Sequence, residues 1–301
     1  MPRVSLIIPV RNQAAYLAES LTSVFAQPYR DLEVIVIDDG STEDLSPAVD
    51  PWRDRLRFVR QEPSGVAAAT NHGARLATAD LLAFHDADDL MEGPRLTSLM
   101  PYLDEDPDLG LVFGNGTEMR ADGTLMGPVI PDRQARALVR RGVRLDELLR
   151  RSFVYLQATI VRRSVFVAAG GLPALPAGGD WGLALRCALH SRIRYVHTTC
   201  FRYRRHEASL TAASVSMAAA AVDVLRDFIA TEPTLTARVG PRRLAQALAR
   251  RLARLAAQQL SAGDAAAARH SLQEASTLAP WMLKYHLRRW RLGRGDDLNR
   301  G

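Results

Sequence analysis

The sequence contains few cysteines and no long apolar run. Only Cys187 and Cys200 occur in 301 residues, and their spacing is typical of neither a zinc site nor a disulfide framework. We interpret both as small buried hydrophobic residues. The apolar runs are of strand length, far below the roughly 20 residues that a membrane-spanning helix needs. Arg3 and the apolar run 4–10 also lack the cleavage pattern of a signal peptide, so we expect a cytoplasmic protein.

Length and composition are those of an ordinary globular protein. Hydrophobic residues make up 47% of the chain and charged residues 24%, and 301 residues are enough for one large domain with an appendage. The net charge of +6 is uneven, because residues 212–301 contain 14 Arg or Lys and 7 Asp or Glu, which leaves residues 1–211 near −1. The basic character therefore belongs to the C-terminal segment.

An apolar run of strand length, 81–85, ends abruptly in acidic residues. Asp86, Asp88 and Asp89 follow it directly. Carboxylates are hard oxygen ligands that suit Mg²⁺ or Mn²⁺. These ions often bind protein carboxylates and substrate phosphates at the same time. A solvated acidic turn that caps a helix expected over 91–104 would have the same sequence, and both interpretations stay open.

A second run ends in the same way. Residues 32–37 are rich in β-branched side chains, which is typical of a strand buried on both faces of a parallel sheet, and Asp38 and Asp39 follow. In such sheets ligands bind at the carboxyl ends of the strands, so the two acidic ends are expected to meet at one cleft. Further strands are expected over 4–10, 56–60, 109–114, 157–161 and 194–196, and helices over 14–27, 65–77, 134–151 and around 185–189.

Four short motifs at family-like spacing carry a resemblance. They are the runs VSLIIPVRN at 4–12, DDGST at 38–42, NHG at 71–73 and DADD at 86–89. Together they resemble family 2 glycosyltransferases with the GT-A fold. This implies an α/β domain over 1–211 with a mostly parallel sheet flanked by helices, in which 1–115 bind the nucleotide and 116–211 the acceptor. Residues 212–301 are expected to form a basic helical extension.

The resemblance also implies roles for single residues. Asp88 and His206 would hold the divalent cation, Mn²⁺ or Mg²⁺, while Arg204 and Arg205 would bind the diphosphate, a task that suits the paired N–H donors of Arg. Asp86 would hold the ribose and Asp39 the base, and Arg11 stands where the family usually has an aromatic residue. The implied nucleotide-binding residues are Pro9, Arg11, Asp38, Asp39, Asn71 and Asp86.

Asp180 is the expected catalytic base. It follows two glycines and precedes an expected helix, where an Asp often serves only as a cap. Its distance from the run GGLP at 170–173 is similar to that of the family's catalytic segment, where Glu-Asp is commoner than Gly179-Asp180. The side chain could serve as both cap and base.

The C-terminal segment is expected to be helical. Leu244, Leu248, Leu252 and Leu255 keep one apolar face, and a turn at 263–264 leads to a second helix over 265–278. The pair resembles a single TPR-like hairpin, which cannot form a solenoid alone. Residues 281–291 mix aromatic and basic side chains, as helices lying on a membrane surface do, and a partner helix or plain packing is equally open.

The expected function is therefore that of a metal-dependent, inverting hexosyltransferase. It would move a sugar from a UDP- or dTDP-type donor to a glycan or lipid-linked glycan in cell-surface polysaccharide synthesis, and a peripheral location at the inner face of the cell membrane fits this role. The alternative is a non-catalytic adaptor that binds a partner or membrane through its basic helices. A nucleotidyltransferase is disfavoured, because no Gly-rich, Lys-ended loop follows the first strand, and no nucleic-acid recognition motif is present.

Overall fold

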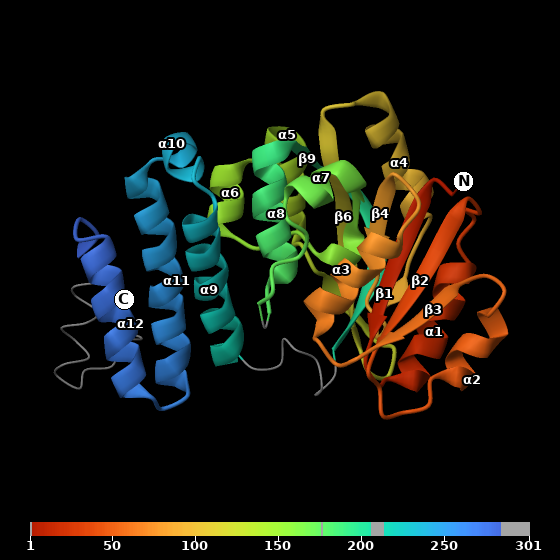
Figure 1. Ribbon diagram of the computed structural model, residues 1–301. Helices are drawn as coiled ribbons and strands as arrows, with labels where there is room; N and C mark the ends of the chain where they lie inside the picture. The colour runs from red at the N-terminus through yellow and green to blue at the C-terminus, as the bar shows by residue number, and fades with distance from the viewer. Residues whose placement is uncertain (1, 176, 206–213, 284–301) are drawn as a thin grey trace. The chain divides into compact units, whose positions relative to one another are not determined.

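The computed structural model describes residues 2–175, 177–205 and 214–283 (Figure 1). The chain divides into two compact units. The first unit comprises residues 1–148, 152–174 and 179–207, and the second comprises 149–151, 175–178 and 208–301. Each unit is described by itself.

The first unit is built on one sheet with helices, which confirms the expected α/β class. The strand order is β3-β2-β1-β4-β8-β6-β9-β5, and β7 pairs with β6. The strands are β1 Val4–Val10, β2 Leu32–Asp39, β3 Arg57–Gln61, β4 Leu81–Phe84, β5 Leu90–Met91, β6 Leu109–Arg120, β7 Leu125–Pro128, β8 Thr159–Arg162 and β9 Arg192–Arg205. The helices are α1 Ala14–Phe25, α2 Ser46–Val49, η1 Asp50–Trp52, α3 Val66–Leu76, α4 Arg95–Glu105, α5 Asp132–Arg141, α6 Leu145–Arg150, η2 Leu156–Ala158, α7 Arg163–Ala168 and α8 Gly179–His190.

The sheet is mixed rather than mostly parallel. Strands β3, β2, β1 and β4 run parallel to one another, as the buried apolar runs predicted, and β9 is parallel to β6. Strand β8 is antiparallel to both β4 and β6. Strand β5 is antiparallel to β9, and β7 is antiparallel to β6. The sequence pattern missed this because a short apolar run such as 159–162 records burial but carries no information on direction.

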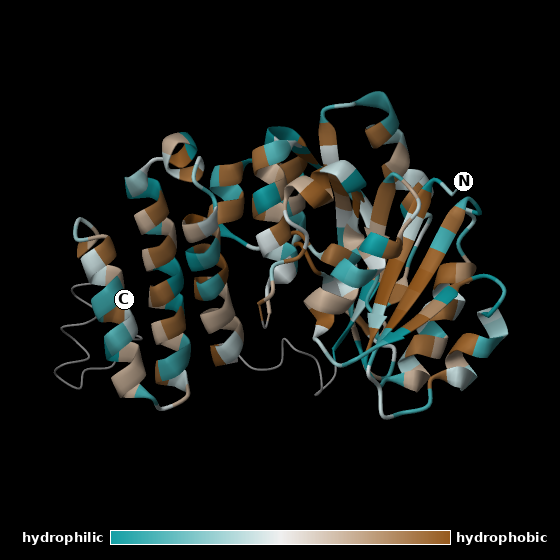
Figure 2. Ribbon diagram, viewed as in Figure 1, coloured by the Kyte–Doolittle hydropathy of each residue, from teal (hydrophilic) through white to brown (hydrophobic). Residues whose placement is uncertain are grey.

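The core of the first four strands follows from their sequence. Most of β1 and residues 34–37 of β2 are apolar and buried, and Figure 2 shows these strands in brown along much of their length. Helix α1 buries Leu17, Leu21, Val24 and Phe25, which recur at helical spacing. The order strand, helix, strand then produces a parallel pair. The carboxyl ends of β1, β2 and β4 consequently lie at one edge of the sheet.

Gly73 lets α3 approach this sheet closely. A Cβ atom at this position would lie 2.5 Å from Ile7 Cγ2 and 3.3 Å from Ile37 Cγ1. Both isoleucines are fully buried in β1 and β2, so neither can easily move aside. The small residue is therefore explained by helix–sheet packing.

We expect Gly73→Ala to destabilise the protein. Overpacking typically costs about 1–3 kcal/mol, against a gain of roughly 1 kcal/mol in helix propensity, so the net loss should be about 1 kcal/mol. Urea unfolding would measure it. Gly127→Ala in β7 is the matched control, because no atom lies within 4 Å of the added Cβ. Equal stability of the two variants would contradict the packing argument.

Four expected elements have different bounds in the structure. The helix expected over 91–104 begins only at Arg95, because Leu90 and Met91 pair with β9 and Gly93 (φ 58°) and Pro94 separate them from α4. The single helix expected over 134–151 is divided into α5 and α6 by Gly142, which has φ 70°. Strands β6 and β9 are longer than expected and pair along most of their length.

The second unit contains helices α9 Ser214–Thr231, α10 Leu235–Val239, α11 Pro241–Ser261 and α12 Ala265–Leu278. Helix α11 packs against both α9 and α12. Its expected apolar face is confirmed, since Leu244, Leu248, Leu252 and Leu255 are buried. Among the residues that the structure describes, none of the helices combines the length and the apolarity that crossing a membrane requires.

Candidate functional site

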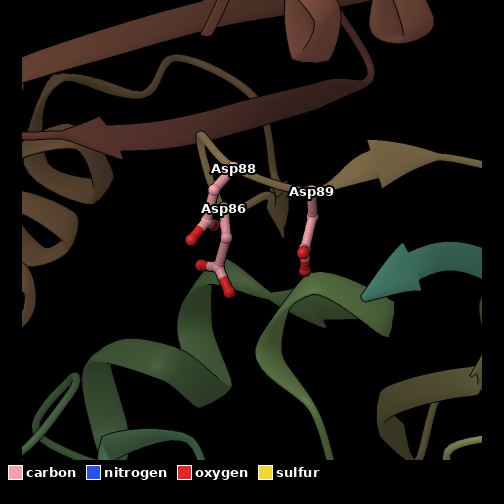
Figure 3. A group of neighbouring side chains, drawn as sticks. All are labelled: Asp86, Asp88 and Asp89. Carbon is pink, nitrogen blue, oxygen red and sulfur yellow. The ribbon is translucent and has the colours of Figure 1, made fainter. Parts of the chain in front are cut away.

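The turn after β4 brings three carboxyl groups together. One carboxylate oxygen from each of Asp86, Asp88 and Asp89 lies within 4.8 Å of the others. The three side chains extend from the same side of the turn (Figure 3). Asp86 and Asp88 are half-buried and Asp89 is fully buried. The apolar strand β4 explains this placement, because it carries the acidic turn directly to the carboxyl edge of the sheet.

Asp89 holds the turn in place. Its Oδ2 accepts a hydrogen bond from Gln157 Nε2 at 2.9 Å, and its Oδ1 accepts one from the backbone N–H of Arg204 at 2.8 Å. Burial and the neighbouring carboxylates Asp86 and Asp88 raise the pKa of Asp89 well above its usual range. Asp89 is fully buried and serves the turn, whereas Asp86 and Asp88 are half-buried and are the better candidates for a cation.

Asp86 lies in a strongly acidic environment. Burial, followed by the charges of Asp88 and Asp180, raises the pKa of Asp86 to about 7, while Arg95 opposes the shift. Crowded carboxylates of this kind are relieved by a cation, and a set of oxygen donors suits Mg²⁺ or Mn²⁺. The residues of the turn therefore fit a divalent cation.

Asp180 opens α8 and lies near this turn, as its effect on Asp86 shows. Its Oδ1 accepts a hydrogen bond from the backbone N–H of Trp181 at 2.7 Å. Burial raises the pKa of Asp180 to about 6 despite this bond. Burial also raises the pKa of Tyr155 to about 12, with a smaller contribution from Asp180, which places this ring nearby. Asp180 thus lies in the first turn of α8, where an acidic side chain favours the helix, and has the surroundings of a base.

Trp181 fixes the start of α8. Its ring is 1% exposed, and its Nε1 donates to the backbone carbonyl of Leu148 at 2.8 Å. Because the residue follows Asp180 directly, the burial of this ring also limits where the Asp180 carboxylate can lie.

Trp181→Phe should lower the free energy of unfolding by about 2 kcal/mol, because it leaves the Leu148 carbonyl buried without this donor. Urea unfolding would measure the loss. Trp52→Phe is a matched control, since the Trp52 ring is only half-buried and stacks on Phe25 at 4.5 Å between centroids. A loss no larger than that of the control would contradict the assignment.

Of the two predicted diphosphate-binding arginines, Arg204 contacts the acidic turn. Its side chain is 4% exposed, its Nε donates to the backbone carbonyl of Asp88 at 2.9 Å, and its Nη2 donates to Glu19 Oε2 at 2.6 Å. Arg205 is more exposed and pairs with Glu118 at 2.5 Å. The predicted metal ligand His206 lies outside the described residues.

The predicted nucleotide-binding residues Asp38 and Asp39 lie in the turn after β2. Asp39 accepts hydrogen bonds from Gln61 Nε2 and from the backbone N–H groups of Ser64 and Gly65, each at 2.8 Å. Asp38 is buried, accepts from the Ser41 N–H at 2.8 Å and pairs with Arg60 at 3.0 Å. These carboxylates therefore shape the loops at this end of the sheet.

The remaining predicted residues lie on two other segments. Pro9 is half-buried in β1 and Arg11 is exposed just after it. The following Asn12 and Gln13 have φ angles of 61° and 70°, uncommon values for residues other than glycine. Asn71 exchanges two hydrogen bonds of 2.9 Å with the backbone of Leu172, and so holds the loop that leads toward Asp180.

The sequence reasoning missed Gln157, Glu19 and Arg95. Arg95 is fully buried, donates to the backbone carbonyl of Thr159 at 2.7 Å, and favours the ionised form of Asp86. Burial lowers the pKa of Arg95 to about 10. Gln157 could have been noticed as a polar residue within an apolar pattern. The contacts of all three residues, however, depend on how distant segments of the chain pack together.

An acidic cluster at the carboxyl edge of an α/β sheet is the arrangement of an enzyme that binds phosphorylated substrates. The sequence profile of Glycosyl transferase family 2 matches residues 5–142. A PGL/p-HBAD biosynthesis glycosyltransferase of Mycobacterium bovis is 30% identical over 210 residues, which is 67% of this chain and 77% of the relative. The chain belongs to glycosyltransferase family 2.

Other relatives match over shorter stretches. Validoxylamine A glucosyltransferase of Streptomyces hygroscopicus is 45% identical over 101 residues, 32% of this chain and 24% of that protein. An uncharacterized glycosyltransferase of Rickettsia felis is 34% identical over 105 residues, 34% of this chain. The chain spans only 17% of the length of that rickettsial protein.

Solved structures confirm the GT-A fold. Staphylococcus aureus TarS residues 1–349, in complex with UDP-GlcNAc, superimposes with a TM-score of 0.69 at 16% identity, covering 98% of this chain and 88% of that one. The mannosyltransferase PcManGT from Pyrobaculum calidifontis, in complex with GDP-Man and Mn²⁺, has a TM-score of 0.64 at 23% identity and covers 97% and 84%. At these identities the likeness concerns the fold.

Proposed function

We propose that this chain transfers a sugar from a nucleoside-diphosphate sugar to an acceptor hydroxyl with inversion at the anomeric carbon. The observation that carries the proposal is that Asp180 lies close enough to Asp86 to raise its pKa, beside Asp88, in a chain of family 2. One carboxylate beside an acidic cation site is what a single displacement with a general base requires.

Asp88 and Asp86 would hold Mg²⁺ or Mn²⁺, with His206 as a further ligand suggested by the family resemblance. When bound, the cation supplies electrostatic stabilisation of the negative charge that builds on the leaving diphosphate. Arg205 would contact the diphosphate from the end of β9. Arg95 supplies a fixed positive charge that favours the ionised form of Asp86.

Asp180 would accept the proton of the acceptor hydroxyl as that oxygen attacks the anomeric carbon. With a pKa of about 6, the carboxylate is ionised at neutral pH and still basic enough to take a proton. The acceptor oxygen approaches from the face opposite the diphosphate, so the configuration inverts.

The donor would carry uracil or thymine, whose imide N–H can donate to Asp39. Three donors already surround this carboxylate, and a carboxylate offers about four lone-pair sites, which leaves one for the base. The acceptor would be a glycan or lipid-linked glycan of a cell-surface polysaccharide, as the family resemblance suggests.

The test is a thermal-shift screen of UDP, dTDP and GDP and their sugars, each with and without Mn²⁺, followed by a donor-hydrolysis assay. A ligand at 100 times its dissociation constant stabilises the fold by about 2.7 kcal/mol. Metal-dependent stabilisation together with slow hydrolysis would support the proposal. Well-folded protein that binds none of these compounds would contradict it and favour the adaptor role.

A further inference from the structure

We propose that Arg204 is a positioning residue, which shapes the acidic turn for its cation by acting through Asp88. The proposal rests on the proposed function, because it concerns the same cation site. It assigns to Arg204 a contact with the protein's own backbone in place of the diphosphate contact that the family resemblance suggests.

The contacts of Arg204 converge on the turn. Its Nε donates to the carbonyl oxygen of Asp88 at 2.9 Å, and its backbone N–H donates to Asp89 Oδ1 at 2.8 Å. One residue of β9 thus restrains the peptide that follows Asp88 and the side chain after it. The peptide between Asp86 and Ala87 is also restrained, since the carbonyl of Asp86 accepts from the Asp89 N–H at 3.2 Å and from Ser20 Oγ at 3.4 Å.

These restraints fix the backbone from which the Asp88 carboxylate extends. The backbone is held on both sides of Asp88, and Gln157 holds Asp89 from another segment. A ligand whose backbone is already fixed loses less conformational freedom when it coordinates an ion. Mutation of a residue that supports a metal ligand by a hydrogen bond commonly lowers the affinity for the metal by a factor of about 10–100.

Helix α1 in turn holds the guanidinium. Glu19 Oε2 accepts from Nη2 at 2.6 Å, and the Tyr16 ring centroid lies 4.8 Å from Cζ. The guanidinium is planar and uses two different nitrogens for Asp88 and Glu19, so the point charge of a lysine cannot reproduce both contacts. With 4% exposure, the side chain is buried against protein groups rather than presented to a substrate.

The two roles make opposite predictions for Glu19. If Arg204 is a diphosphate ligand, Glu19 competes with the substrate, and Glu19→Gln should strengthen diphosphate binding. If Arg204 positions the turn, Glu19 supports it, and Glu19→Gln should weaken cation binding in the same direction as Arg204→Lys, by a smaller factor. The Glu19 side chain is 55% exposed, so this variant should fold normally.

The experiment measures Mn²⁺ binding by electron paramagnetic resonance, first with Mn²⁺ alone and then with UDP or GDP. Arg204→Lys should weaken Mn²⁺ binding about tenfold, and Glu19→Gln should weaken it by a smaller factor. Arg202→Lys is the matched control, because Arg202 lies two residues earlier on β9 and pairs with Glu92 at 2.9 Å. This control should bind Mn²⁺ as the parent does.

Hydrogen exchange of the peptide that covers 82–89 provides a readout without metal, and this peptide excludes Glu92, the partner of the control residue Arg202. It should accelerate in Arg204→Lys and Glu19→Gln and remain unchanged in Arg202→Lys. Unchanged exchange, or tighter UDP or GDP binding by Glu19→Gln, would overturn the positioning role. If the parent bound no Mn²⁺ under any condition, the proposed function would fail, whereas faster exchange in the two variants would still support the restraint of the turn.

Discussion

Replacing Asp180 with asparagine should lower the turnover number about 10²–10⁴-fold, the usual contribution of a general base. Asparagine keeps an oxygen that can accept from the Trp181 N–H, so the local hydrogen bond survives. The loss should therefore appear in turnover, with little change in donor binding, and it can be measured as nucleoside diphosphate released per second at saturating donor and acceptor.

The pH profile should separate a base from a cap. Because burial raises the pKa of Asp180 to about 6, turnover at saturating Mn²⁺ should fall as pH decreases through about 6, by tenfold per pH unit below it. Asp180→Asn should lose this limb. Asp132 in the first turn of α5 is the matched control, because Asp132→Asn removes an acid from the first turn of another helix. Equal effects of the two substitutions on turnover would favour the cap.

Stability should change in the opposite sense to activity. A carboxyl whose folded-state pKa is raised binds its proton more tightly in the folded protein, so stability falls as pH rises from about 4 to about 6. Asparagine does not ionise, so Asp180→Asn should melt at a higher temperature than the parent above pH 6 and at a similar temperature below pH 4. A variant that loses both activity and stability at pH 8 would point to damage of the fold instead.

Asp88→Ala should abolish metal-dependent turnover. A cation contributes several kcal/mol to the stabilisation of the departing diphosphate, and each 1.36 kcal/mol corresponds to a tenfold rate, so the loss should be about 10³-fold or more. Stabilisation by nucleoside diphosphate in the presence of Mn²⁺ should disappear as well, as a thermal-shift titration would show.

Asp80→Ala is the matched control for this substitution. Asp80 precedes β4, whereas Asp88 follows it, and the Asp80 side chain is almost fully exposed. Unchanged activity in Asp80→Ala excludes a general effect of removing an acid near this strand. Full Mn²⁺-dependent turnover by Asp88→Ala would show that the cation is held elsewhere.

The first half of the fold could be predicted because its strands are continuous apolar runs in the sequence. The apolar runs at 4–10, 32–37 and 81–84 predict both a strand and its burial. A strand buried on both faces favours a parallel sheet with covering helices. The acidic turns could be predicted for the same reason, since a charge directly after such a strand must lie at the sheet edge.

The sequence by itself thus determined the family, the parallel half of the sheet, the apolar face of α11 and the position of the acidic turn after β4. Only the tertiary structure decided the antiparallel insertion of β8, the pairing of β5 with β9, and the partners of Asp89, Asn71 and Arg204. The physical reason is that burial and helical periodicity are local properties of a segment. A hydrogen bond such as that from Arg204 to the Asp88 carbonyl joins residues more than 100 positions apart. It therefore forms only after the strands have paired in the folded sheet.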